Sequence, residues 1–267
     1  MKKSRILLII FLVIAAAATI IFELPGVVLT ADETKNILLK ELFSRIILAA
    51  FVIFLVVYGR FNSLKIERNN LGKHLLFIIP CLLVALANFP FSALISGSAV
   101  IERVDLIYIL VINCVLIAII EDFFFQGILR SVIDDYFKNT SHRIFISILV
   151  TAIVFALSHL LNLLSGAAIG ATLLQVGYTF LIGAMFSTIK TKTNNIYLIV
   201  VLHSIFDIGG TIVTKLGNGV FQDKIFWILT ISFGIIAGIY ILVNIIIMDR
   251  KDTLDLHKSQ ETTEIIN

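Results

Sequence analysis

The sequence predicts an all-α polytopic membrane protein with about eight transmembrane helices. Of its 267 residues, 59% are hydrophobic and only 15% are charged, and the mean hydropathy is +1.03. Soluble domains carry roughly 25% charged residues, so this composition lies far outside their range. Stretches of about 20 apolar residues, each long enough to cross a bilayer as a helix, recur along the chain. They lie at about residues 6–22, 37–58, 75–95, 106–129, 144–164, 168–189, 196–213 and 225–248.

The first stretch follows the basic segment MKKSR and resembles a secretory signal. Its apolar run is long and further membrane segments follow, so we expect a retained helix. With both termini on the cytoplasmic side, 15 of the 21 Lys and Arg residues fall in cytoplasmic loops. This bias follows the positive-inside rule and agrees with an even number of crossings. We therefore expect a multi-pass plasma-membrane protein with cytoplasmic termini, from a prokaryotic cell.

The chain reads as one polytopic membrane domain over residues 1–248, followed by a short, charged and solvated cytoplasmic tail at 249–267. The net charge of +3 reflects membrane topology, and no basic patch interleaved with exposed aromatic residues indicates nucleic-acid binding. Cys81 and Cys114 both fall inside candidate spans and are interpreted as small apolar filling residues.

Ionisable residues deep inside candidate spans are the strongest functional signal. Each costs about 2.5–3.5 kcal/mol at a helix centre on insertion scales, so it needs a structural or functional reason. Five such residues lie in the fourth, fifth and seventh spans: Glu121, Asp122, His159, His203 and Asp207. Taken singly, each can be a helix-bridging hydrogen-bonding group. Together they predict a functional cavity formed by these three helices.

The spacing of these residues indicates which of them share a helix face. His203 and Asp207 are four residues apart, so both can act on one group between them. Phe155 and His159 have the same spacing, which places an aromatic ring one turn below the imidazole.

Glu121 and Asp122 are adjacent, so on a helix they point about 100° apart. We expect Glu121 to face the common site and Asp122 to face a neighbouring helix. At about 1.5 Å per residue, Glu121 and His159 fall at different depths of the membrane if both helices are regular. The sequence therefore predicts irregular spans around a water-filled cavity.

These residue types leave three kinds of site open: a hydrolase, a proton-coupled transporter and a metal site. Acids and histidines can activate water and stabilise an oxyanion, and the same groups can relay protons. A glutamate and two histidines can also bind zinc. Since HExxH is absent and the histidines come from distant helices, no metal or other cofactor is expected.

Three short segments in order, EDFFFQG, FALSH and LHSIFD, resemble the motifs of the CPBP family. This family comprises CaaX proteases and bacteriocin-processing enzymes and is also called Abi. Its motifs read E-E-x-x-x-R, F-x-x-x-H and H-x-x-x-N/D. Each motif is short, but their ordered succession on hydrophobic helices is fairly specific. The resemblance covers a family-like core at about residues 75–215.

The resemblance implies a metal-independent intramembrane endopeptidase of the glutamate type. It assigns Glu121 as general base, with Asp122 as its helper, and His159 as its partner in activating the attacking water. It assigns His203 and Asp207 to the stabilisation of the tetrahedral oxyanion. Because an ionised aspartate is a poor hydrogen-bond donor, Asp207 is expected to orient His203.

Two positions depart from the family motifs. Asp122 stands where the second glutamate is expected, and Gln126 occupies the arginine position. Gln126 cannot neutralise a carboxylate, so the balancing charge must come from elsewhere. Arg130, one turn further along, is either that substitute or an ordinary positive-inside anchor.

The leading prediction is therefore a protease that cleaves hydrophobic membrane-associated peptides or proteins, such as CaaX-like, pheromone or bacteriocin-type substrates. Its expected surroundings are the lipid bilayer and no nucleic acid. One alternative is a non-catalytic bacteriocin-immunity or regulatory protein with the same fold, acting for example with a membrane sensor. The other is a proton-coupled transporter, although no pair of broken repeats supports it.

Overall fold

The computed structural model describes residues 13, 17, 22, 26–59 and 70–266, and these are predominantly helical. Seven segments of this part are long and apolar enough to cross a membrane: Glu33–Tyr58, Ile79–Ser96, Val104–Tyr136, Arg143–Leu164, Ile169–Thr193, Ile196–Leu216 and Lys224–Lys258. They correspond to the second to eighth predicted stretches, so the all-α polytopic membrane fold is confirmed. The first candidate, at residues 6–22, lies almost entirely outside the described residues.

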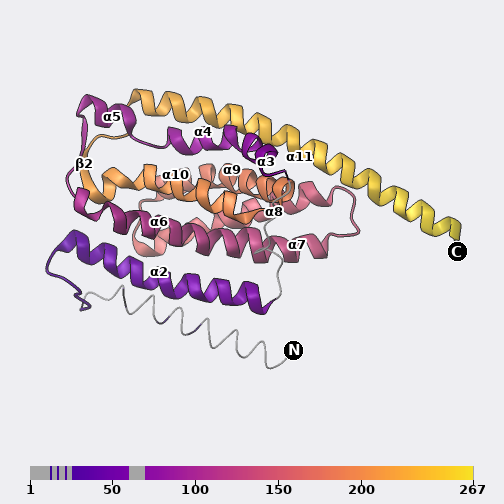
Figure 1. The fold of residues 1–267 in the computed structure, drawn as a ribbon, viewed down its shortest axis with the longest axis horizontal. Coiled ribbons are helices and arrows are strands. Elements are labelled where there is room, and N and C mark those ends of the chain that lie inside the picture. Colours follow the sequence, from indigo (N-terminus) through magenta and orange to yellow (C-terminus); the bar gives the residue numbers. More distant parts are fainter. Residues whose placement is uncertain (1–12, 14–16, 18–21, 23–25, 60–69, 267) are drawn as a thin grey trace.

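The long helices form a series of neighbours that brings the fourth and seventh predicted spans side by side. α2 packs on α6, α6 on α10, α10 on α4 and α4 on α11, while α8 and α9 pair behind them (Figure 1). A buried cluster that includes Phe186, Ile199 and Leu202 joins α9 to α10. The helices are α2 (Glu33–Tyr58), α4 (Ile79–Ala87), α6 (Ile107–Asp122), α8 (Arg143–Ser158), α9 (Ile169–Thr193), α10 (Ile196–Leu216) and α11 (Lys224–Ile266).

Shorter elements lie at both ends of the bundle, with α5 and β2 at one end and α3 and α7 toward the other (Figure 1). The strands β1 and β2 pair antiparallel, with Ala99 opposite Gly219 and Ile101 opposite Gly217. A side chain at either glycine would collide with a carbonyl oxygen of the β1 segment, so glycine permits this close pairing. The shorter elements are α3 (Leu71–Phe77), α5 (Phe91–Ser96), β1 (Ala99–Ile101), the 3₁₀ helix η2 (Val104–Leu106), α7 (Arg130–Tyr136) and β2 (Gly217–Gly219).

Two spans lose regular α-helical geometry at the motif residues. The π-helix η3 (Phe123–Leu129) begins directly after Asp122, and the 3₁₀ helix η4 (His159–Ser165) begins at His159 itself. The predicted irregularity of these spans is therefore confirmed. π-helical turns inside α-helices are frequent at functional sites because they shift side chains away from the regular register.

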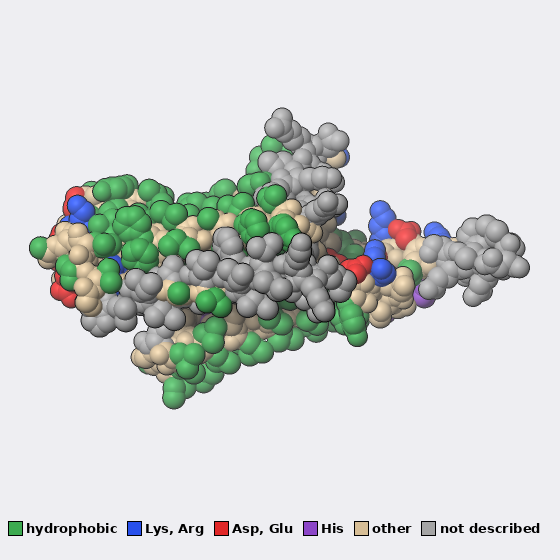
Figure 2. All heavy atoms as spheres, turned by 90° about the horizontal axis from the view of Figure 1, so that it is seen from below, with side chains coloured by type: hydrophobic (Ala, Val, Ile, Leu, Met, Phe, Trp, Pro, Cys, Tyr) green, Lys and Arg blue, Asp and Glu red, His purple; other side chains and the backbone are tan. Residues whose placement is uncertain are grey.

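On the face shown in Figure 2, hydrophobic side chains predominate on the described part of the bundle, and charged side chains gather toward its two ends and on the projecting part of α11. Large apolar residues such as Ile95 and Leu181 are 87% and 60% exposed, which fits a surface that faces lipid.

The last helix extends well past the predicted end of its span. α11 continues as one helix to Ile266. Asp249 is buried, accepts a hydrogen bond from the backbone of Phe145 and lies 2.7 Å from Nδ1 of His142. Asp252 pairs with Arg143. The expectation of a simply solvated tail is therefore wrong for its first turn, because these acids cover the amino end of α8.

Candidate active site

Four of the five predicted site residues meet around the imidazole of His203, on the seventh predicted span. Asp122 Oδ1 lies 3.2 Å from Nδ1 of this ring. Glu121 Oε2 lies 3.7 Å and Asp207 Oδ2 lies 3.6 Å from its Nε2. Three carboxylates from α6 and α10 thus surround one imidazole.

The Asp122 side of the ring is closed to solvent. The side chains of His203 and Asp122 are 7% and 2% exposed, and their 3.2 Å contact is a hydrogen bond. The second carboxylate oxygen of Asp122 is buried without a hydrogen-bond partner. Because a buried carboxylate needs hydrogen bonds or charge compensation, His203 is an essential partner of Asp122.

The Nε2 side of the ring is more open. The side chains of Glu121 and Asp207 are 21% and 25% exposed. Both carboxylates are beyond hydrogen-bond distance from Nε2, although they are close enough to interact with its charge. A water molecule or a substrate oxygen approaching this side would find two carboxylates and a ring nitrogen available.

Glu121 and Asp122 both contact His203, although adjacent side chains on a helix point in different directions. The expectation that only one of them can address a common group is wrong, because the imidazole presents nitrogens on two sides. Asp122 faces Nδ1 and Glu121 faces Nε2. The other part of the expectation agrees with the structure, since Asp122 contacts the neighbouring helix and Glu121 is the more exposed acid.

Aromatic rings position the imidazoles. The ring of Phe155 lies 5.1 Å from that of His159 and 6.4 Å from that of His203, measured between centroids. Phe186 lies 5.2 Å from His203 on the same measure. The spacing of Phe155 and His159 therefore places the two rings together as predicted. Gly183 of α9 permits this packing, since a Cβ there would lie 2.9 Å from the Phe155 ring.

His159 contacts the same Phe155 ring as His203 but belongs to a separate polar chain. Gln175 Nε2 lies 3.3 Å from Nδ1 of His159, and Asn162 donates to Gln175 Oε1 at 2.8 Å. The Nε2 atom of His159 is buried without a hydrogen-bond partner. Neither Gln175, on the helix between the second and third motifs, nor Asn162 is among the five predicted site residues.

The departures from the family motif are accommodated without bringing Arg130 to the acids. Buried Gln126 accepts a 2.6 Å hydrogen bond from Ser187. Arg130 is also buried but bonds to Asp134 at 2.8 Å and to Thr191 at 3.1 Å. Of the two alternatives for Arg130, substitution for the missing motif arginine is therefore not what the structure shows.

The positively charged groups near Glu121 and Asp207 come from other residues than Arg130. His203 contacts them directly, and Arg45 of α2 is close enough to interact electrostatically with Glu121 and Asp207. Arg45 also lies 3.6 Å from Glu41, so its charge is shared among three acids. Sequence reasoning missed this arginine, because its helix carries none of the motifs.

The carboxyl end of the third motif is fixed by a residue that the sequence analysis did not identify. Asn88, at the end of α4, donates a 2.7 Å hydrogen bond to the carbonyl of Phe206. Gly209 and Gly210 permit this approach, since a Cβ at either position would lie under 3.0 Å from Phe89 or Asn88. A pair of glycines one residue beyond LHSIFD was the available sequence signal.

The described residues do not form a metal-binding site. Among the residues with described positions, no group of three or more His, Cys, Asp or Glu side chains is placed to hold a metal ion. Cys81 and Cys114 are free and buried.

The motif region is similar to a known protein family. Residues 103–209 match the family model described as type II CAAX prenyl endopeptidase Rce1-like. No curated protein and no solved structure matches the chain. The matched region begins just before η2, ends in α10, and contains all five predicted site residues. Residues 103–209 of this membrane-embedded protein are thus similar to the Rce1-like type II CAAX prenyl endopeptidases, which is consistent with the CPBP family and supports, at family level, a membrane endopeptidase.

Proposed function

We propose that the protein is a metal-independent, glutamate-type intramembrane endopeptidase. Its substrate would be a hydrophobic peptide or a membrane protein, of CaaX-like, pheromone or bacteriocin type. The observation that carries the proposal is the position of His203, with buried Asp122 on Nδ1 and the more exposed Glu121 and Asp207 beside Nε2.

In this mechanism Glu121 is the general base. Its carboxylate is the more accessible member of the acidic pair and can accept a proton from a water molecule. The water oxygen attacks the carbonyl carbon of the scissile peptide bond and forms a tetrahedral intermediate. Glu121 then returns the proton to the leaving nitrogen as the C–N bond breaks, so no proton is gained or lost over the cycle.

His203 would stabilise the oxyanion of that intermediate. Its Nδ1–H donates to Asp122, so the ring offers a second N–H at Nε2 when it is an imidazolium. The surrounding carboxylates compensate the positive charge. Asp207, one turn along α10, orients the ring from the Nε2 side. A charged donor that is already in position lowers the barrier without reorganisation during the reaction.

His159 would hold the attacking water. Gln175 donates to Nδ1 of His159 because the carbonyl oxygen of Gln175 is occupied by Asn162. A neutral imidazole that accepts at Nδ1 carries its proton on Nε2. This N–H is buried and unpartnered, so it is available to donate to the oxygen of a bound water.

The proposed location is a prokaryotic plasma membrane, with both termini in the cytoplasm. Support comes from the apolar exterior of the bundle and from the bias of basic residues in the sequence. A membrane-embedded site suits a peptide bond that lies within or beside the bilayer, while the adjacent helices supply the polar groups that lipid cannot.

The test is a comparison of membrane-enriched peptides in cells that produce the wild-type chain, Glu121→Gln or His159→Ala. Glu102→Gln is the matched control for the first variant, because Glu102 is an exposed carboxylate outside the His203 cluster. A peptide terminus present in wild type and control, and absent from both site variants at equal protein abundance, supports proteolysis and identifies the substrate. Unchanged peptides in all four strains contradict it.

A non-catalytic regulatory or immunity protein is the second candidate. The observation in its favour is Gln126, which occupies the arginine position of the family motif and bonds to Ser187 instead of to an acid. Such a protein would keep its cellular phenotype in the Glu121→Gln variant. A catalytic protein would lose it.

A further inference from the structure

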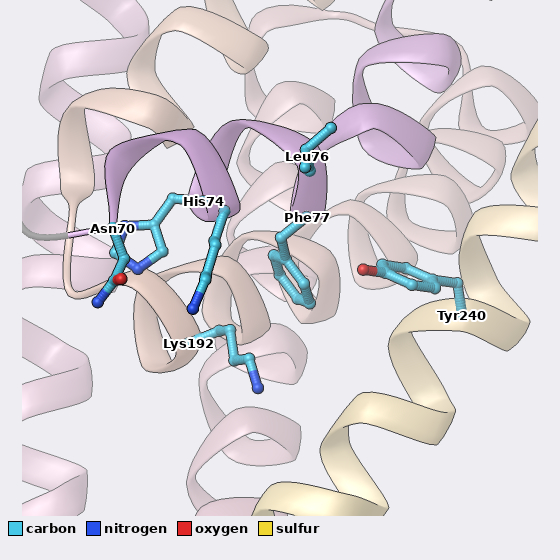
Figure 3. A pocket seen from close by; sticks show the side chains of 7 residues that line it. Asn70, His74, Leu76, Phe77, Lys192 and Tyr240 are labelled. Carbon is cyan, nitrogen blue, oxygen red and sulfur yellow. The ribbon is translucent and has the colours of Figure 1, made fainter.

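A pocket of about 400 Å³ lies away from the His203 cluster, where α3, the end of α9 and the middle of α11 come together (Figure 3). Phe77, Lys192 and Tyr240 reach it from these three helices. The lining residues are Asn70, Lys73, His74, Leu76, Phe77, Lys192 and Tyr240. None of them belongs to the proposed catalytic machinery.

The described residues that line this pocket carry only positive charge. Lys73 and Lys192 contribute two ammonium groups, and none of the described lining residues is an Asp or Glu. Within the described part of the chain, neither lysine makes an ion pair. A concave site with two ammonium groups and no carboxylate attracts anions.

Neutral polar groups add hydrogen-bonding capacity. His74, Asn70 and Tyr240 line the same space as the lysines. The Nδ1 atom of His74 is buried and has no hydrogen-bond partner. Since buried polar atoms are nearly always paired, this nitrogen is a second sign that a polar ligand belongs here.

The other wall is apolar and continues into the outer surface of the bundle. Leu76 is 68% exposed, while Phe77 is buried and packs against Tyr240 with 5.4 Å between ring centroids. Figure 3 shows Phe77 and Tyr240 side by side. Leu76 lies next to Phe77 on the short helix α3. The neighbouring Leu75 is also exposed, at 47%. A ligand in this pocket would therefore meet cations on one side and a lipid-facing surface on the other.

We propose that this pocket binds the phosphate group of an anionic membrane lipid. A phosphodiester headgroup would be held by Lys73 and Lys192, with His74, Asn70 and the Tyr240 hydroxyl as hydrogen-bonding groups. The acyl chains would lie along Leu76 and the adjacent apolar surface. Free phosphate offers the same charge, but it would leave this apolar wall unused. Basic pockets between membrane helices are known to bind such headgroups.

The experiment uses the purified full chain in a neutral detergent, with equal amounts of phosphatidylglycerol and phosphatidylcholine. Native mass spectrometry counts the lipid adducts on each protein. The test variant is Lys73→Gln with Lys192→Gln. The control is Lys138→Gln with Lys251→Gln, which removes the same charge from exposed lysines outside the pocket. Thermal unfolding in phosphatidylcholine alone establishes that all three proteins are folded.

The expected result is a preference for phosphatidylglycerol in wild type and control. The test variant should bind that lipid roughly 30-fold more weakly, because each lysine near a membrane surface is worth about fivefold in affinity. Equal binding of the anionic lipid by the test variant overturns the proposal, as does equal binding of both lipids by the wild type.

A separate titration with inorganic phosphate distinguishes a lipid headgroup from free phosphate, since both carry the same anionic group. Millimolar phosphate should not displace phosphatidylglycerol, because it lacks the apolar contacts. Displacement at these concentrations overturns the assignment to lipid.

Discussion

The carboxylate of Asp122 and Nδ1 of His203 lie 3.2 Å apart, and both side chains are almost completely buried. One residue ends α6 and the other lies within α10, so their hydrogen bond joins the first and third motifs. Phe155 and Phe186 pack near the imidazole and limit its movement. The bond therefore links the stability of the helix pair to the geometry of the candidate active site.

Removing the carboxylate of Asp122 should destabilise the protein. Asp122→Ala leaves His203 without its hydrogen-bond partner, and breaking a buried charged pair typically costs about 3–5 kcal/mol. Asp122→Asn keeps an acceptor of similar shape, so its cost should be smaller. Denaturant unfolding in detergent measures both. Equal stability of the alanine variant and the wild type would show that the pair contributes little.

Glu121→Gln should separate activity from stability. General-base catalysis commonly contributes about 10²–10⁴-fold in rate, so cleavage of the identified substrate should fall by at least 100-fold. The partly exposed side chain loses no hydrogen bond that the structure shows, and its unfolding temperature should change little. A purified variant that retains more than a tenth of wild-type cleavage would exclude Glu121 as the base.

Gln175→Ala should lower the cleavage rate through His159. Without the donor at Nδ1, the imidazole can place its proton on either nitrogen and can rotate, so we expect a fall of about 10–100-fold, the range seen for groups that orient metal-bound histidines. Leu174→Ala, an exposed neighbour on α9, is the control.

The ¹⁵N chemical shifts of the His159 ring report its tautomer independently of activity. They should show an Nε2–H imidazole in the wild type and a mixture in Gln175→Ala. Identical spectra would remove Gln175 from this role.

Gly183→Ala should displace the Phe155 ring, which packs against His159 and His203. The new Cβ would lie 2.9 Å from the Phe155 ring and 3.3 Å from the backbone of Ala152. Overpacking of this kind costs about 1–3 kcal/mol, and movement of Phe155 should also lower activity. Gly234→Ala is the matched control, since a Cβ there meets nothing within 4 Å. Thermal unfolding measures the stability of both variants. Gly234→Ala should be neutral or slightly stabilising. Similar effects of both substitutions would show that the Phe155 contact is not the cause.

The pairing of Asp32 with Arg103 predicts a pH dependence of stability outside the membrane spans. Arg103 donates two hydrogen bonds to Asp32, and this contact, with a further bond from the Lys35 backbone, lowers the pKa of the Asp32 carboxyl from 3.8 to about 2. Because the folded-state pKa is the lower one, the contribution is complete above pH 3.8 and is lost as the pH falls toward 2.

Unfolding measured between pH 5 and pH 2 should therefore show a steeper loss of stability for the wild type than for Asp32→Asn. Asp135→Asn, which removes an exposed acid paired with Lys138, serves as the comparison. Parallel curves for wild type and Asp32→Asn would contradict the assignment.

The sequence alone determined the membrane fold and the chemical groups of the site. Apolar stretches of sufficient length identify spans because the bilayer fixes the required length. The four-residue spacings correctly placed Phe155 beside His159 and His203 beside Asp207, since neighbours on one helix follow from helical geometry alone. Polar residues within apolar runs identified the two helices, α6 and α10, whose side chains meet around His203.

Only the tertiary structure decided which groups pair across helices. Asp122 and Glu121 face two sides of one imidazole, Arg130 bonds to Asp134, and Arg45 comes from a helix without a motif. These relationships depend on how helices dock and where they become irregular, which local spacing does not specify. The burial of Asp249 against the start of α8 has the same origin, because a charged segment is buried only when a distant helix end offers it partners.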